Sequence, residues 1–489
     1  MKFKLSNLIW GSALLFTTGC KKFVESGDVN INPNKPAFVT LNTLLPAVED
    51  ATANSQGYVA FTTSLFSQQM AAYQSGPIDD DRNRDVRMSS AYYSLYQTSL
   101  TNSHLMIAMA QEQGSPSYAG IAHILFVYNL MMATDAWGEV PYSQAFQAPS
   151  ILYPGYDKQE DLYPLMHAML DSAINETQAT NPAALKPGTD DLVFSGDMTA
   201  WLQTAYFIKA KLYMHTTKKG AAAAANSALT ALGNGYTSGS KVFQLVYNDK
   251  NQNPWFKNVA GRIVGAVYTI GPSKRFIDAL NGTSYPGLID PRLTVLVDKK
   301  SSASYTGLLN GSGGTGNTTD VTNNTFFAKS AAPLLFGSYA EQKLMEAEAL
   351  FLSNGGNAGS VGSTQAAYDA YYAGIAYNLK YLGIDTAAGL PGNDYLNNAQ
   401  VAVGAAGLTL ELIMRERQVA LFLNPEAWDD VRRYDYNPAL FTGMELPQNQ
   451  DPEMSGNYIR RSGYPLDEIN RNPNVPSDKK LFDKVWWDQ

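Results

Sequence analysis

Apolar residues recur at helical spacing along most of the chain, and glycine or proline breaks separate the periodic segments. Pro46 and Gly57 are expected to break the first of these segments. Because many neighbouring segments are joined by short connections, the pattern predicts antiparallel helix pairs that bury their faces on one another, as tetratricopeptide-like repeats do. The helices are expected over residues 44–70, 88–109, 117–132, 161–178, 199–217, 221–232, 338–352, 364–382 and 408–423.

A different pattern occupies residues 234–335, where turn residues separate short β-like runs at 242–247, 263–270 and 293–297. Within it, residues 307–324 are rich in Gly, Ser, Thr and Asn and predict a long exposed loop. Residues 436–489 contain many prolines and little periodicity, which indicates an irregular cap. We therefore expect one mainly α domain over residues 38–489. Its helical scaffold covers about 40–233 and 336–435, and its loop- and β-containing binding region covers about 234–335.

The first residues have the pattern of a bacterial lipoprotein signal. Lys2 and Lys4 precede an apolar run that is too short to span a bilayer, and Cys20 follows three small residues. We expect residues 1–19 to be removed and Cys20 to carry lipid, followed by a flexible tether over 20–37. The alternative is an ordinary secretory signal with an incidental cysteine.

Composition narrows the range of partners. The formal net charge is −8, which argues against nucleic acid and against electrostatic docking on anionic lipid. Cys20 is the single cysteine, and the four histidines are scattered, so neither an internal disulfide nor a metal site built from Cys or His is expected. Charged residues make up only 16%, whereas the chain has 29 Tyr, 20 Phe and 7 Trp. This balance suits a neutral polyhydroxy ligand or a peptide.

Motifs for catalysis are missing from the sequence. Residues 311–316 match the letters of a dinucleotide-binding glycine motif, but they lie in a low-complexity loop. Residues 79–81 are three aspartates that could hold a structural calcium ion, although a solvated run beside a helix is the favoured interpretation. Residues 429–433 place two aspartates beside two arginines, which predicts a salt-bridge cluster at a helix end. We expect a binding protein without enzymatic activity and without a cofactor.

Aromatic rings stack on the apolar faces of sugars, and amide, carboxylate and guanidinium groups bond to their hydroxyls. Candidate ligand contacts are therefore aromatic side chains outside the helical stripes, together with a polar cluster before a helix. Core packing is the alternative role for each ring. These candidates are Tyr73, Trp255, Phe256, Tyr285 and Tyr305, with Asp80, Arg82 and Asn83.

Several segments resemble signatures of the SusD/RagB-like nutrient-binding outer-membrane lipoproteins. Residues 135–145 resemble the family's D-x-W-G-x-V-P-Y-x-x-A motif, and residues 339–349 are similar to its Y-A-E-x-K-L-x-x-A-E-A helix. Residues 410–417 with 428–433 resemble its I-x-x-E-R/K … W-x-D-x-R-R segment. Within the first motif, Trp137 and Tyr142 are expected to anchor the helix exit to the next helix pair. Such residues identify the scaffold, but they do not identify the ligand.

The resemblance implies a scaffold of four tetratricopeptide-like helix pairs with an irregular binding face. It also implies a lipid-anchored protein of the outer membrane, facing the cell exterior, that acts as a lid on a SusC-like TonB-dependent transporter. Its cargo would be an oligosaccharide or other glycan. Two alternatives stay open: the same lid role with a peptide or other nutrient, and a lipid-anchored glycosidase.

Overall fold

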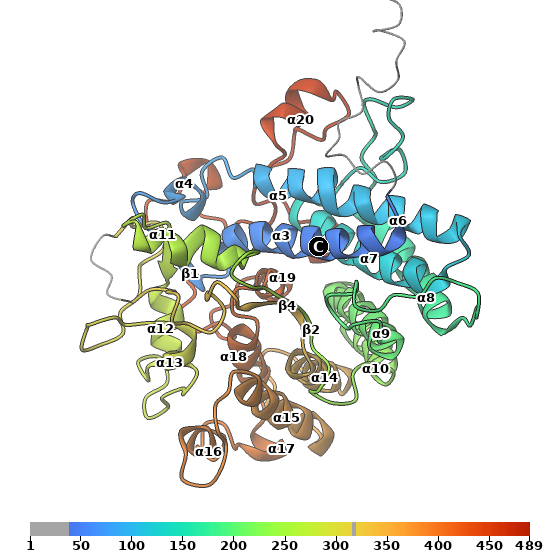
Figure 1. Cartoon of the computed structure of the whole chain (residues 1–489). Helices are drawn as coiled ribbons and strands as arrows, with labels where there is room; N and C mark the ends of the chain where they lie inside the picture. The colour runs from blue at the N-terminus through green and yellow to red at the C-terminus, as the bar shows by residue number, and fades with distance from the viewer. Residues whose placement is uncertain (1–38, 315–318) are drawn as a thin grey trace, which may run out of the picture.

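The computed structural model describes residues 39–314 and 319–489, and it has a mainly α fold with two small sheets (Figure 1). The predicted lipidation site at Cys20 lies outside the described residues. Helices α6, α7, α8, α9, α10, α14 and α15 pack in that order, each on the next. The long helices are α3 (Leu41–Phe66), α6 (Thr101–Glu112), α7 (Pro116–Trp137), α8 (Gln159–Gln178), α9 (Met198–His215), α10 (Ala221–Leu232), α14 (Tyr339–Ser353) and α15 (Gln365–Tyr381).

Shorter helical segments complete the scaffold and its loops. Helix α5 (Ser89–Tyr93) continues through the π-helical η2 (Ser94–Leu100) into α6. The others are α4 (Ile78–Asp81), η3 (Thr216–Lys219), η4 (Phe256–Ala260), α11 (Gly261–Val264), α12 (Lys274–Leu280), α13 (Leu293–Leu296), α16 (Pro391–Leu396), α17 (Gly404–Gly407), α18 (Leu410–Ala420), α19 (Glu426–Arg433), η5 (Pro452–Met454), α20 (Leu466–Arg471) and η6 (Trp486–Asp488).

Hydroxyl side chains fix the start of several helices. The Oγ of Ser338 accepts a 3.1 Å hydrogen bond from the amide of Glu341 at the start of α14. Thr364 and Thr409 cap α15 and α18 in the same way. These bonds satisfy amides that lack a partner within the helix, so the three helices begin where the sequence predicts.

Helix α3 is continuous, which corrects the expected breaks at Pro46 and Gly57. Pro46 is near the start of the helix, and it removes the one bond that its amide would donate to the carbonyl of Asn42, an exposed residue. Gly57 is buried, and a Cβ built there would lie 2.7 Å from the Cβ of Pro254. The glycine therefore permits close packing of the segment at Pro254 on the helix.

Both sheets are two-stranded and antiparallel. Strand β1 (Met70–Ala72) pairs with β3 (Ile270–Pro272), and β2 (Phe243–Val246) pairs with β4 (Pro333–Gly337). Of the expected β runs, 242–247 is confirmed by β2. The run at 293–297 is wrong, since it forms α13, and only the end of 263–270 is a strand. Apolar runs this short fit a buried helical turn as well as a strand.

The predicted salt-bridge cluster exists, but it is buried inside the scaffold. The guanidinium of Arg433 contacts Oε1 of Glu348 at 2.6 Å and Oδ1 of Asp430 at 2.5 Å. Arg417 contacts Oδ2 of the same Asp430 at 2.8 Å. All four side chains are almost fully buried, so each charge depends on its partners. The cluster joins helices α14, α18 and α19.

The C-terminal loops cover one end of helix α7. The indole of Trp137 donates a 2.9 Å hydrogen bond to the carbonyl of Gly463, and Arg461 donates to the carbonyl of Trp137. Trp137 thus anchors the helix exit to the cap, and not to the next helix pair as expected. By length and composition α7 could cross a membrane, but it is buried throughout and serves as the core helix.

Candidate functional site

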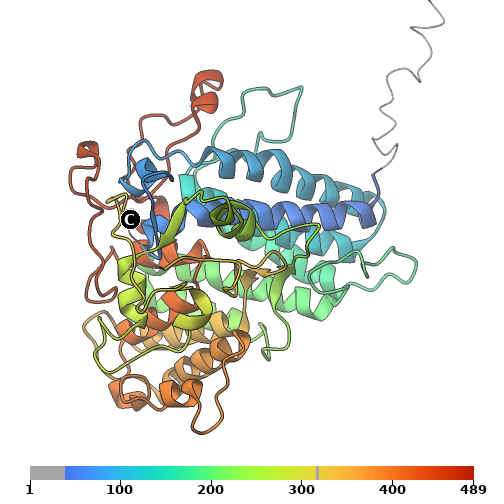
Figure 2. The same cartoon turned by 60° about the vertical axis from the view of Figure 1, so that its left-hand side comes forward.

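Strands β1 and β3 bring the predicted polar loop at residues 73–84 next to part of the expected binding region, which covers about 234–335. Tyr73 forms a bridge with Gly313, and Ser273 forms one with Leu308. We call the three segments 73–87, 268–273 and 306–314 together the loop face. In Figure 2 the loops of the C-terminal cap run along the side of the molecule where α4 lies.

The carboxylate of Asp81 joins segments of the loop face that lie far apart in the sequence. Its carboxylate accepts hydrogen bonds from the amides of Ala72, at 2.9 Å, and Gly311, at 2.7 Å, and from Nδ2 of Asn310 at 2.7 Å. Burial raises its pKa to about 6, against the pull of these donors. The expectation of a solvated aspartate run is therefore wrong for Asp81. Calcium binding by the aspartate run stays a prediction.

The neighbouring polar residues link the loop face to the C-terminal cap. Arg82 donates from Nε to the carbonyl of Gly311 at 2.8 Å and accepts from the amide of Asp451. Asn83 is buried in the left-handed region, at φ +56°, where the chain turns. Asp80 is partly buried, and burial beside the other aspartates raises its pKa to about 6.

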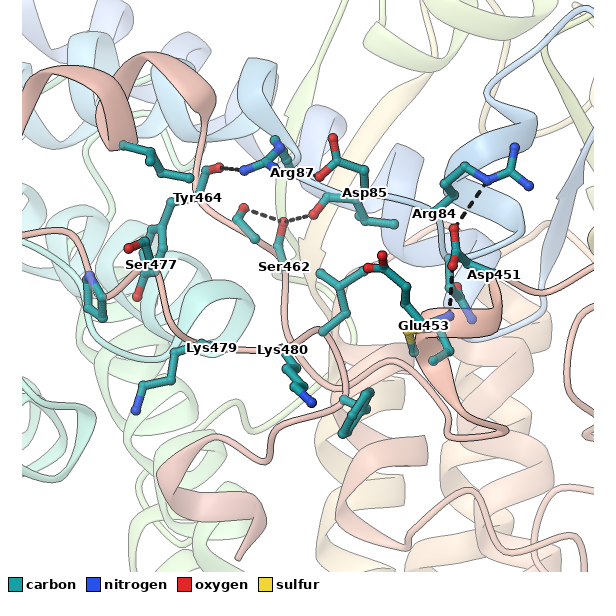
Figure 3. Close-up of a pocket in the computed structure, with 18 residues that line it drawn as sticks. Arg84, Asp85, Arg87, Asp451, Glu453, Ser462, Tyr464, Ser477, Lys479 and Lys480 are labelled. Atoms are coloured by element: carbon teal, nitrogen blue, oxygen red, sulfur yellow. Dashed lines mark hydrogen bonds and ion pairs between the residues drawn. The ribbon is translucent and has the colours of Figure 1, made fainter.

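A cleft of about 750 Å³ opens between this turn and the C-terminal cap (Figure 3). Its size is within the range of small-molecule sites. One wall is the segment 83–87, and the others come from segments 451–454, 462–469 and 476–482. The lining carries hydroxyls and charges beside apolar side chains, including Ser462, Tyr464, Ser477, Lys479, Lys480 and Phe482.

The predicted ring contacts do not gather in this cleft. Tyr73 is buried, and its hydroxyl donates to Oδ1 of Asp320 at 2.5 Å. Trp255 is only 4% exposed and packs 6.4 Å from Phe61, measured between ring centroids. Neither ring offers a free face to a ligand, so core packing explains both. Phe256 is half-buried against the main core.

Tyr285 has a structural role between two charges of helix α18. Its hydroxyl donates to Oε1 of Glu411 at 2.8 Å, and the guanidinium of Arg415 lies 5.0 Å from its ring centroid. Tyr305 lines a separate cavity of about 960 Å³ between the loops around α13 and helix α16. That cavity is mainly apolar, with Leu288 and Ile289 in its wall. Of the five predicted rings, Tyr305 is therefore the one that lines either cavity.

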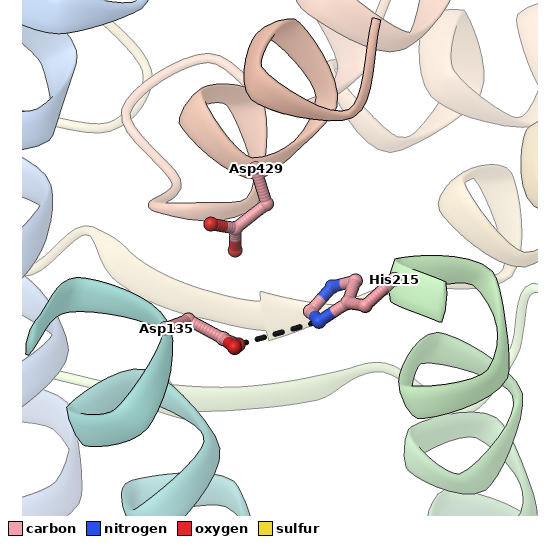
Figure 4. A group of neighbouring side chains, drawn as sticks. All are labelled: Asp135, His215 and Asp429. Atoms are coloured by element: carbon pink, nitrogen blue, oxygen red, sulfur yellow. Dashed lines mark ion pairs between the residues drawn. The ribbon is translucent and has the colours of Figure 1, made fainter. Parts of the chain in front are cut away.

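Three buried side chains, Asp135, His215 and Asp429, could in principle hold a metal ion (Figure 4). Burial alone would lower the pKa of His215, but the carboxylates of Glu426 and Asp135 raise it to about 10. Nδ1 of the ring lies 3.3 Å from Asp135 and Nε2 lies 2.9 Å from Glu426, so each ring nitrogen faces a carboxylate. This geometry fits a protonated imidazole that serves as the cation of the cluster.

Sequence reasoning missed the part of the cleft that the C-terminal cap contributes. The segments 451–454, 462–469 and 476–482 have no periodic pattern and lie almost 400 residues from the turn at Asn83. The sequence feature that could have indicated this part of the cleft is the adjacent pair Lys479 and Lys480, because charged residues are few in this chain. Of the predicted site residues, Asn83 lines the cleft, and Asp80 and Arg82 lie beside it.

Comparison with known protein families agrees with the resemblance seen in the sequence. A family model described as SusD-like, "Starch-binding associating with outer membrane", matches residues 33–465. No curated protein matches this chain.

Solved structures share the fold at low sequence identity. A chitin-binding protein superposes with a TM-score of 0.73 at 22% identity, covering 92% of this chain and 100% of that one. A SusD/RagB family protein from Bacteroides thetaiotaomicron gives 0.71 at 21% identity, with 92% and 99% covered. A chitin-binding SusD homologue from Flavobacterium johnsoniae gives 0.70 at 18% identity, with 92% and 98% covered.

Proposed function

Because the chain belongs to the SusD-like family, we propose that it is a nutrient-binding protein of the outer membrane that captures oligosaccharides in the cleft of Figure 3. The observation that carries this proposal is the cleft itself, since it combines a suitable volume with hydroxyl and charged groups. The chitin-binding neighbours support a glycan as cargo. The alternative cargo is a peptide or another nutrient.

We propose a role in binding and not in catalysis. Glycoside hydrolysis generally needs two carboxylates on either side of the bond that breaks. In the cleft, Asp85 pairs with Arg87 at 2.6 Å and Asp451 pairs with Arg84 at 3.2 Å. Among the described lining residues, Glu453 is the remaining carboxylate. A glycosidase is therefore the weaker proposal.

We further propose that the protein is anchored through lipid on Cys20, faces the cell exterior and closes as a lid over a SusC-like TonB-dependent transporter. The family's association with the outer membrane supports the location. Replacing Cys20 with alanine should release the protein from the membrane fraction. Affinity purification of the wild type in mild detergent should recover a barrel of larger mass, and recovery of the protein alone would contradict the lid role.

The binding proposal is tested with the purified soluble domain and a broad panel of glycans, using calorimetry. Ser477 is exposed on the wall of the cleft, so Ser477→Trp should fill the cleft and abolish binding of the glycan that the wild type binds. Ser172 is also exposed, on helix α8 outside the cleft lining, and Ser172→Trp should bind normally. Unchanged binding by the Ser477 variant would place the site elsewhere, whereas binding of peptides alone would exclude a glycan cargo.

A further inference from the structure

The basic side chains of the cleft stand out in a chain that is acidic as a whole. The chain has 36 basic and 44 acidic residues, yet the cleft lining has more bases than acids. The bases are Arg84, Arg87, Lys479 and Lys480, and the acids are Asp85, Asp451 and Glu453. The excess is local and small, so its effect depends on which of these charges are already paired.

The two arginines of the cleft are paired and the two lysines are not. Arg84 contacts Asp79 and Asp451, and Arg87 contacts Asp85. Over residues 39–314 and 319–489 the structure gives neither Lys479 nor Lys480 an ion pair with a carboxylate. Figure 3 shows both lysines on the segment that faces the 83–87 wall across the cleft. Two ammonium groups are thus available for an incoming anion.

Groups suited to a sugar lie beside the two lysines. The Nζ of Lys480 is 5.5 Å from the ring centroid of Phe482, which is half-buried in the cleft wall. Ser477 adds an exposed hydroxyl. A ring, a hydroxyl and an ammonium group together match a sugar that carries a carboxylate or sulfate.

A second cavity adjoins the cleft at Lys479. It has a volume of about 490 Å³, and Lys479 lines both cavities. Lys158, Arg461 and Lys484 also line it, but each of them is paired with a carboxylate, those of Glu160, Glu139 and Asp435. Lys479 therefore lies between two cavities, and its ammonium group is available to a ligand in either one.

We propose that the cleft selects acidic oligosaccharides, meaning sugars that bear uronate or sulfate groups, through Lys479 and Lys480. This inference rests on the proposed glycan-binding function and narrows its cargo. A ligand carboxylate would bond to the ammonium groups while its sugar ring packs on Phe482. A neutral sugar of the same shape would leave both lysines without an anionic partner, as they are in the free protein.

The test uses calorimetry on the soluble domain with uronate-containing and sulfated oligosaccharides, each compared with its carboxyl-reduced or desulfated counterpart. The wild type should bind the acidic member about tenfold more tightly for each charge-assisted bond, less so at high salt. The double variant K479Q/K480Q should lose this preference. The control K250Q/K329Q changes the net charge equally at two exposed lysines outside the cleft, and it should keep the preference.

The outcomes separate the two proposals. Equal binding of acidic and neutral members would overturn the selection for acidic cargo and leave the glycan-binding function standing. A preference that survives in K479Q/K480Q would overturn the role of the two lysines. Failure of every glycan to bind would overturn the proposed function, and tighter binding of an acidic peptide such as oligoglutamate would replace the glycan with a peptide.

Discussion

The indole of Trp487 donates a 2.7 Å hydrogen bond to Oδ1 of Asp135, a carboxylate on helix α7 that lies 352 positions earlier in the chain. The hydroxyl of Tyr163 donates to the same oxygen at 2.6 Å. Trp487 is fully buried, and its ring also lies 4.7 Å from the guanidinium of Arg432. The cap is thus fastened to the core of the scaffold through a hydrogen-bonded aspartate.

Replacing Trp487 with phenylalanine should remove this bond and leave a buried oxygen with fewer donors. We expect the free energy of unfolding to fall by about 1–3 kcal/mol, measured by chemical denaturation. The adjacent Trp486 is a matched control, since it is partly exposed and contacts Lys219 through its ring face. An equal loss in Trp486→Phe would mean that the bond to Asp135 contributes nothing specific.

Replacing Glu348 with glutamine should destabilise the protein strongly, because Arg433 would keep its buried charge while losing a partner at 2.6 Å. Breaking one partner of a buried pair costs about 3–5 kcal/mol. Glu346 lies on the same helix, but its pair with Lys343 is partly exposed, so Glu346→Gln should cost less than about 1 kcal/mol. Denaturant unfolding of both variants compares them directly, and similar losses would show that burial does not govern the effect.

Stability should fall as pH rises from about 6.5 to about 10. The pKa of His215 is near 6.5 in the unfolded chain and is raised to about 10 in the fold by Glu426 and Asp135, against the effect of burial. The folded state therefore binds this proton more tightly, and the contribution is fully present below pH 6.5 and lost as pH passes through 10. Melting temperatures of the wild type and His215→Gln across this range provide the measurement. A parallel pH dependence in the two proteins would exclude His215 as the source.

Asp81→Asn should loosen the loop face without unfolding the scaffold. The carboxylate accepts from the amides of Ala72 and Gly311, and an amide side chain satisfies these donors less well. We expect both amides to exchange hydrogen about tenfold faster, as a local opening would allow. Asp79 is an exposed neighbour, and Asp79→Asn should leave the exchange rates unchanged. Unaltered rates in the Asp81 variant would contradict its clamping role.

Much of the scaffold is predictable from local pattern, because a helix such as α10 follows directly from its alanine-rich period over residues 221–232. Tertiary packing decides the exceptions. Gly57 taken alone suggests a helix break, yet it allows close packing against Pro254. Residues 293–296 form a helix, although their apolar run suits a strand equally well. The binding site is less predictable. Tyr73 and Trp255 have the composition of ligand contacts, but long-range packing buries them, and the cleft draws on residues beyond 450 that carry no periodic signal.

The bond between Trp137 and Gly463 also constrains when the protein can acquire its final form. Its two ends are 326 positions apart, so the helix at the centre of the fold cannot complete its packing until almost all of the chain has been synthesised. Contacts of this range close slowly, because a long loop must be ordered first. Until then the apolar surface of α7 is open to aggregation. We therefore expect an emerging chain to depend on a chaperone for longer than its helical content alone would require.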